Sequence, residues 1–176
     1  IESYLQKNKY DVILYGTIVT HYKWIKWLTH TIKKHQPETL TVIGNSVAGS
    51  CYEVFMNNCP ADVVVIGEGE ITCSEVLDAI INGKGFEGIE GTAYRSKEGK
   101  IVKNPKRTAA KKLDDLPRPD WSLFDINKYF DKTIDLSFGD DEEDEKIILP
   151  VSTARGCAFR CTFCHFVFWD DPYRYR

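Results

Sequence analysis

The sequence of 176 residues lacks any apolar run close to the roughly 18 residues that a membrane-spanning helix needs. It also lacks the pattern of a signal peptide, because its first ten residues are polar and amphipathic. We therefore expect a cytoplasmic protein with no membrane partner. The sequence opens on Ile1 rather than on methionine, so we also expect a piece of a longer chain.

The sequence has little excess of either charge. It holds 23 Lys and Arg against 26 Asp and Glu, which gives a formal net charge of −3. Nucleic-acid binding through bulk electrostatics needs a basic surface, so no nucleic-acid partner is expected. Hydrophobic residues make up 43% and charged residues 28%, as in ordinary globular proteins. The length suits one domain with part of a second.

The six cysteines fall into two groups. Three are scattered through the first half and are expected to be small buried residues: Cys51, Cys59 and Cys73. The other three lie within a short loop: Cys157, Cys161 and Cys164. Without a secretion signal a disulfide framework is not expected, so the tight group indicates a metal site.

Apolar runs and helical patterns alternate through the first half. After a helix end at 1–9, strands are expected at 11–15, 40–43, 61–66, 89–95 and 100–102, and helices at 21–35, 51–57 and 70–81. The alternation of strand and helix indicates right-handed crossovers within a parallel sheet. We therefore predict an α/β fold with a partial doubly wound parallel sheet.

Glycine stands at the end of each of the first three predicted strands. In such sheets ligands bind at the carboxyl ends of the strands, at a switch in strand order. Glycine allows a ligand to approach the backbone closely, although it can also serve only to make the turn. The candidate ligand-binding residues are Tyr15, Gly16, Thr17, Gly44, Asn45, Gly67 and Glu68.

The second half has a different character. Residues 103–112 are basic, residues 113–121 are punctuated by proline, and residues 140–145 are acidic. We expect an ordered linker followed by a solvated acidic loop. A new apolar strand at 147–153 leads to the cysteines. The predicted organisation is an α/β domain at 1–96, a linker with short strands and the acidic loop at 97–146, and a further unit at 147–176.

The cysteine loop, residues 155–164, has the spacing Cys157-x-x-x-Cys161-x-x-Cys164. Thiolates select zinc, copper(I) or iron–sulfur clusters. Structural zinc takes four ligands, and cubane clusters usually take four thiolates. Three thiolates in one loop would leave one iron open to a substrate or cofactor. The spacing favours an iron–sulfur cluster, with zinc and unligated or disulfide-forming thiols as the alternatives.

The stretch Arg-Gly-Cys-Ala-Phe-Arg-Cys-Thr-Phe-Cys, following an apolar strand, resembles the cluster loop of the radical S-adenosylmethionine (SAM) superfamily. The resemblance implies a 4Fe-4S cluster on the three cysteines at the start of a (β/α) barrel. It also implies SAM on the open iron and its reductive cleavage to a 5′-deoxyadenosyl radical. Phe163 would lie near the adenine or shield the cluster, or would simply pack. The implied partners are a small-molecule substrate and an electron donor such as flavodoxin or ferredoxin.

The upstream part resembles the cobalamin-binding domain, of flavodoxin or Rossmann type, that precedes the barrel in one large subgroup. That subgroup includes anaerobic magnesium-protoporphyrin monomethyl ester cyclase and several radical SAM methylases. The resemblance implies cobalamin as a cofactor and methyl transfer or cyclisation as the reaction. The matching stretches are Asp11–Gly16, Val42–Asn45, Asp62–Glu70, Gly88–Tyr94 and Leu113–Trp121.

Two departures from the family pattern leave alternatives open. The motif Asp-x-His-x-x-Gly of many cobalamin domains is absent, and Tyr15 and Asn45 are bulkier than the usual residues and could crowd the cofactor. The α/β part could therefore bind a cofactor without catalysis, or only pack on the barrel. The sequence stops soon after Cys164, so we expect a chain truncated at both ends. We also expect it to be inactive alone and to show association or disorder over 140–176.

Overall fold

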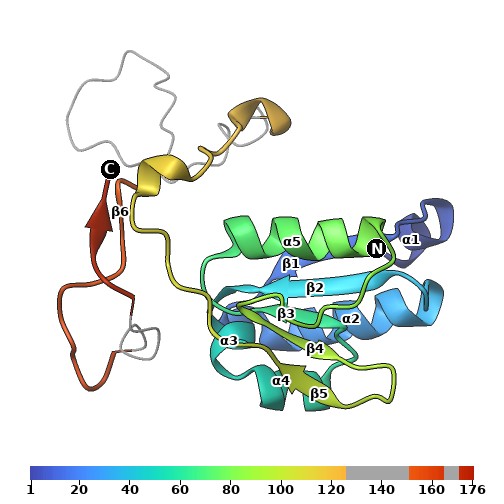
Figure 1. The fold of residues 1–176 in the computed structure, drawn as a ribbon. Helices are drawn as coiled ribbons and strands as arrows, with labels where there is room; N and C mark the ends of the chain where they lie inside the picture. The colour runs from blue at the N-terminus through green and yellow to red at the C-terminus, as the bar shows by residue number, and fades with distance from the viewer. Residues whose placement is uncertain (126–150, 165–170) are drawn as a thin grey trace.

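The computed structural model describes residues 1–125, 151–164 and 171–176. Five strands form one sheet in the order β1-β2-β3-β4-β5 (Figure 1). β1, β2 and β3 are parallel, whereas β4 and β5 each pair antiparallel with the preceding strand. The strands are β1 Val12–Gly16, β2 Leu40–Gly44, β3 Val63–Val65, β4 Thr92–Arg95 and β5 Ile101–Lys103. The predicted α/β fold is confirmed, with a mixed sheet in place of a wholly parallel one.

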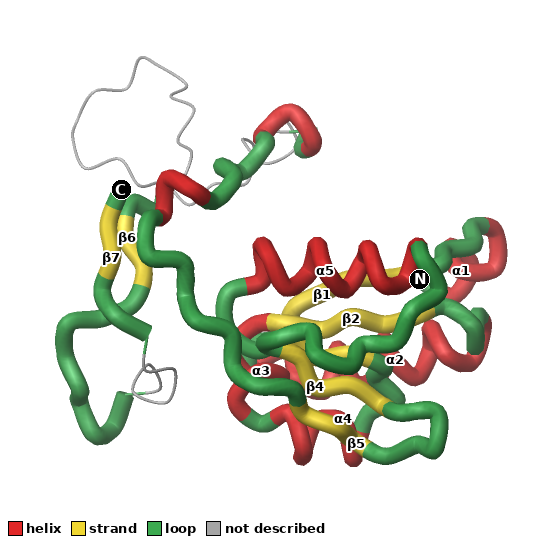
Figure 2. Tube along the Cα trace, viewed as in Figure 1, coloured by secondary structure: helices red, strands yellow, loops and turns green. Residues whose placement is uncertain are grey.

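Helices cover both faces of the sheet (Figure 2). α2, α3 and α4 lie on one face, and α5 lies on the other (Figure 1). Because the two crossovers from β1 to β3 use the same face, the described strands follow one another without the expected switch in order. The helices are α1 Glu2–Lys7, α2 Tyr22–His35, α3 Asn45–Ser50, α4 Tyr52–Asn58 and α5 Gly69–Ile81, with 3₁₀ turns η1 Val19–His21, η2 Leu113–Asp115 and η3 Trp121–Leu123.

The core lies on both sides of β3. Successive side chains of a strand point to opposite faces. Val63 and Val65 pack with Val76 of α5, whereas Val64 packs with Phe55 and neighbours on the other face. All three valines are at most 4% exposed. This two-sided burial explains why the strand is a continuous apolar run rather than an alternating one.

Near the end of the sequence, two short strands form an antiparallel ribbon, β6 Ala154–Arg155 with β7 Arg174–Tyr175. Of the strand predicted at 147–153, residues 147–150 lie outside the described residues, and 151–153 have no regular structure. The acidic run at 140–145 also lies outside them. Within the described part of the chain, no helix is long and apolar enough to cross a membrane.

The first prediction concerns the core. Phe55 is 1% exposed, whereas its neighbour Val54 on α4 is 62% exposed. Phe55→Ala should lower the free energy of unfolding by about 3–5 kcal/mol, because it removes buried apolar contacts and leaves a cavity. Val54→Ala should change it by less than about 0.5 kcal/mol. Urea unfolding followed by circular dichroism measures both. Equal losses in the two variants would show that this side of the sheet is not the core.

Candidate functional site

The carboxyl edge of the sheet, where β1, β2 and β3 end, brings the predicted glycines together. Gly16 and Gly44 are direct partners in the register of β1 and β2. Gly44 faces the α5 side of the sheet, since its nearest neighbour there is Val65 of β3. Gly67 follows β3 at the same edge. The structure therefore places three of the predicted site residues side by side.

The backbone conformation of Gly44 does not require glycine at this position. Its φ of −128° and ψ of −159° are extended values that any residue adopts. A Cβ built on it would meet only the Cβ of Val65, at 4.0 Å. Neither strain nor a close neighbour among the described residues requires glycine at this position. The space beside Gly44 is open, as a ligand approaching the backbone would need.

The other two edge glycines have local explanations. Gly67 has a φ of +90°, which L side chains adopt only with strain, and nothing lies within 4 Å of its Cβ position. Gly67 therefore makes the turn from β3 to α5. A Cβ on Gly16 would lie 3.2 Å from the Cβ of Asn45. Gly16 is therefore small because Asn45 packs against it.

Asn45 has a φ of +73° and is alone among the described non-glycine residues in having a positive φ. Asparagine tolerates this left-handed conformation better than most residues. Its side-chain Oδ1 accepts a hydrogen bond from the backbone N of Ser46 at 2.6 Å. Strained positions of this kind gather at ligand sites. Asn45 is bulkier than the residue usual at this position, as the sequence indicated, and its side chain packs against Gly16.

Tyr15 and Thr17 stand at the edge but turn their side chains inward. The Tyr15 hydroxyl lies 2.6 Å from Oγ1 of Thr29 on α2. Burial raises the pKa of Tyr15 well above its ordinary value, so the hydroxyl stays neutral. Thr17 is 1% exposed, and its backbone N donates to the carbonyl of Gly44 at 3.1 Å. Both side chains therefore lie on the inner side of the edge, and the Tyr15 ring does not cover it.

Glu68 and Glu70 follow Gly67 at the start of α5, and both carboxylates bind arginines of the second half. Glu68 receives two hydrogen bonds from Arg174, at 2.7 and 3.0 Å, and Glu70 receives one from Arg155 at 2.5 Å. Burial raises the pKa of Glu68, but the hydrogen bonds and charge of Arg174 outweigh it, so the pKa lies below its ordinary value. The hydrogen bond from Arg155 lowers the pKa of Glu70. Both groups are therefore carboxylates at neutral pH.

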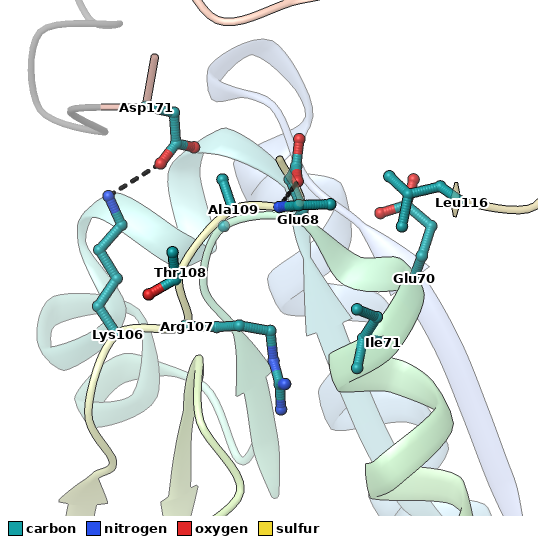
Figure 3. Close-up of a pocket in the computed structure, with 11 residues that line it drawn as sticks. Glu68, Glu70, Ile71, Lys106, Arg107, Thr108, Ala109, Leu116 and Asp171 are labelled. Atoms are coloured by element: carbon teal, nitrogen blue, oxygen red, sulfur yellow. Dashed lines mark hydrogen bonds and ion pairs between the residues drawn. The ribbon is translucent and has the colours of Figure 1, made fainter. Parts of the chain in front are cut away.

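A small pocket lies beside these carboxylates, between the start of α5 and residues 106–110 (Figure 3). In Figure 3 Lys106 and Asp171 point toward each other, and they form an ion pair of 3.0 Å. The backbone N of Ala110 donates to Glu68 at 3.3 Å. The sequence pattern predicted Glu68 as a site residue but not its arginine partner Arg174. No pattern around Arg174 marks it, because the partner lies 106 residues away.

The cysteine loop presents its thiols to solvent. Cys157 and Cys161 are exposed and Cys164 is half-buried. The backbone N of Phe159 donates to Cys157 Sγ at 3.4 Å, and amide hydrogen bonds to sulfur are among the features that tune iron–sulfur clusters. The predicted Phe163 is 92% exposed.

The metal assignment of the loop depends on its donor set. Within the described residues, no three His, Cys, Asp or Glu side chains are gathered as they would be around a metal ion. Three thiols on a short loop, two of them exposed, nevertheless fit an iron–sulfur cluster by donor type. The ligand role of the three cysteines stays a prediction.

The three scattered cysteines do not share one environment. Cys59 is buried and Cys73 is partly buried, as expected for small apolar residues. The prediction is wrong for Cys51, which is exposed. Cys51 lies between α3 and α4, just before the helix that was predicted at 51–57 and forms at Tyr52–Asn58.

The geometry thus shows an α/β edge with open backbone at Gly44. Residues 1–77 match the B12 binding domain family. The matched range contains the whole carboxyl edge. The match agrees with the resemblance of the upstream sequence to cobalamin-binding domains.

Two curated relatives are similar to the chain over most of its length. An uncharacterized methyltransferase of Pyrococcus horikoshii is 33% identical over 160 residues, which are 89% of this chain and 32% of the relative. The anaerobic magnesium-protoporphyrin IX monomethyl ester cyclase of Rubrivivax gelatinosus is 30% identical over 149 residues, or 82% and 25%. The chain therefore spans about a third or less of the length of these relatives.

Among solved structures, the cobalamin-dependent S-adenosylmethionine radical enzyme OxsB, with aqua-cobalamin and S-adenosylmethionine bound, has a TM-score of 0.69 and 21% identity. The match covers 92% of this chain and 21% of that one. It shows that the chain has the fold of the corresponding part of that enzyme. The fold likeness extends beyond residues 1–77, which match the B12 binding domain family, since the covered share is larger.

The second prediction separates the two kinds of glycine at the carboxyl edge. Gly67→Ala should lower the free energy of unfolding by about 1–2 kcal/mol, because the new side chain meets a positive φ. Gly44→Ala should leave it unchanged or raise it by up to about 1 kcal/mol, since the backbone is extended and the unfolded chain loses freedom. Urea unfolding of the two variants side by side checks this. A larger loss for Gly44→Ala would contradict the open space beside Gly44.

Proposed function

We propose that this chain is the cobalamin-binding part and the cluster loop of a cobalamin-dependent radical SAM enzyme. The observation that carries the proposal is the open backbone at Gly44, which lies inside the residues that match the B12 binding domain family. The three-cysteine loop in the same chain supports the second half of the proposal. The Pyrococcus horikoshii relative is described as a methyltransferase and the Rubrivivax gelatinosus relative as a cyclase, so methyl transfer and cyclisation are the two candidate reactions.

The carboxyl edge would hold the corrinoid through the shape of its backbone. The motif Asp-x-His-x-x-Gly does not occur in these 176 residues. Gly44 leaves space above the sheet, and Asn45 offers a side-chain amide beside it. The backbone N of Thr17 links the ends of β1 and β2 through its hydrogen bond to the carbonyl of Gly44, and Tyr15 ties β1 to α2 through Thr29. A bound corrinoid would supply a cobalt centre able to carry a methyl group.

The cysteine loop would hold the iron–sulfur cluster. Its three thiolates are the protein's ligands, and the exposure of Cys157 and Cys161 leaves them accessible to iron and sulfide. A bound 4Fe-4S cluster would supply the electron that cleaves S-adenosylmethionine. An electron donor such as flavodoxin or ferredoxin, a small-molecule substrate and a cytoplasmic location belong to the same proposal.

A second candidate is a domain that only packs on the barrel and binds no corrinoid. The observation in its favour is Asn45, whose Cβ comes within 3.2 Å of the Cβ position of Gly16 and fills part of the edge. Tyr15 no longer supports this candidate, since its ring turns toward α2. Direct titration with a corrinoid separates the two candidates.

The third prediction tests cobalamin binding. Titration of the chain with hydroxocobalamin, followed by absorbance and calorimetry, should show saturable binding. Gly44→Leu should raise the dissociation constant about tenfold or more, because the added side chain occupies the open space. Glu38→Leu is the matched control, since this exposed residue precedes the opposite end of β2, and it should leave the constant unchanged.

Circular dichroism and the urea midpoint check that both of these variants fold. If Gly44→Leu binds as tightly as the wild-type chain, the cofactor does not sit at the carboxyl edge. A wild-type chain that binds no hydroxocobalamin would favour the domain that only packs on the barrel.

The fourth prediction tests the cysteine loop. Anaerobic reconstitution with iron and sulfide should load the wild-type chain with a cluster, measured by iron and sulfide content and by visible absorption. Cys157→Ala should lose most of the bound iron, because one of three thiolate ligands is gone. Cys51→Ala removes another exposed thiol, which lies outside the loop, and this variant should keep the iron. Equal iron in the two variants would rule out the loop as the ligand set.

A further inference from the structure

The carboxylates of Glu68 and Glu70, here called the acidic pair, bind the two arginines that border the cysteine segment. These two, here called the arginine pair, are Arg155, two residues before Cys157, and Arg174, ten residues after Cys164. The arginine pair stands directly opposite in the register of β6 and β7. The acidic pair therefore contacts both ends of the segment that contains the proposed cluster ligands.

The contacts between the two pairs are close and largely sheltered. Arg174 donates two hydrogen bonds to the Glu68 carboxylate, at 2.7 and 3.0 Å. It also donates a hydrogen bond of 2.6 Å to the carbonyl of Ala110. Only 7% of the Arg174 side chain and 18% of the Glu68 side chain are exposed. Two-pronged arginine–carboxylate contacts are stronger and more directional than single ones.

Arg155 completes the arrangement. It reaches Glu68 at 3.4 Å and Glu70 at 2.5 Å. Like charges directly opposite in a ribbon repel each other. Without the acidic pair, the arginine pair would push apart the strands of a ribbon that is only two residues long on each side. The acidic pair therefore supplies the compensating charge that lets the ribbon close.

The two ends of the cysteine segment are also in close backbone contact. Gly156 has a φ of +78°, and a Cβ on it would lie 2.3 Å from the carbonyl oxygen of Pro172. The backbone on either side of the cysteines thus meets at the ribbon. Glu68 directly precedes α5 and Glu70 lies in its first turn, so the ribbon is attached to the helix that follows the carboxyl end of β3.

We propose that the acidic pair positions the cysteine loop relative to the carboxyl edge by holding the arginine pair. The inference rests on the proposed function for its purpose, because a cobalt centre and a cluster must stand at a defined separation to act on one substrate. A catalytic constellation has to be held within about 0.5 Å by supporting contacts. The acidic pair and the arginine pair are such contacts, and they are positioning residues rather than catalytic ones.

Hydrogen exchange of the full chain tests the attachment without any cofactor. In the double variant Glu68→Gln, Glu70→Gln, the hydrogen-bonded amides within residues 154–164, among them Phe159 and Cys164, should exchange about tenfold or more faster, since charge-assisted hydrogen bonds that hold the segment are lost. Amides of β2 and β3 should be unchanged. Glu75→Gln is the matched control, because Glu75 lies on the same helix and pairs with Arg107 instead. It should leave the loop as protected as in the wild-type chain.

A charge exchange separates a positioning role from a general loss of stability. Glu68→Arg alone should speed exchange in the loop, and adding Arg174→Glu should return protection toward the wild-type value. Unchanged exchange in the double variant, or no recovery in the charge exchange, would overturn the inference.

Electron paramagnetic resonance then tests the link to the cofactors. In the wild-type chain loaded with cob(II)alamin and a reduced cluster, the interaction between the two spins should show one narrow distribution of separations. The double glutamine variant should bind the same cobalt and iron but show a broadened or shifted distribution. An unchanged distribution would overturn the inference. A wild-type chain that takes up neither cofactor would overturn the proposed function, and the exchange experiment would still decide whether the acidic pair holds the loop.

Discussion

The burial of β3 on both faces is the constraint on which the rest of the structure depends. Val63, Val64 and Val65 are nearly inaccessible, so the short strand has one position between α4 and α5. The chain leaves that strand through Gly67, whose positive φ directs it into α5. Both residues of the acidic pair follow at once. The packing of three valines thus determines where the charged contacts of the site can form.

The carboxyl edge has two regions, one with open backbone and one with paired charges. On β1 and β2 the edge carries few side chains besides Asn45, because Gly16 and Gly44 stand together and Tyr15 turns inward. Beyond β3 the edge is acidic, and its carboxylates are neutralised by the arginine pair. The two regions suit different tasks. Open backbone suits a large cofactor, and paired charges suit the attachment of a neighbouring segment.

The relatives place this arrangement in a wider context. The chain matches proteins described as a methyltransferase and a cyclase over most of its own length and a smaller part of theirs. Its fold likeness to OxsB extends across nearly all of the chain, including residues beyond the matched B12 binding domain. This agrees with a second half that is attached to the first by specific contacts.

The elements and the candidate edge could be predicted from the sequence because they depend on local patterns. Apolar runs ending in glycine located β1, β2 and β3 closely, and apolar spacing located α2 and α5. The direction of the Tyr15 side chain, the exposure of Cys51 and the antiparallel course of β4 could not be predicted, since each depends on packing between distant elements. The same holds for Arg174, whose partner Glu68 lies 106 residues away. Sequence alone determined which residues end the strands and which carry thiols. Only the tertiary structure decided which side chains meet, because those contacts form between segments that share no local pattern.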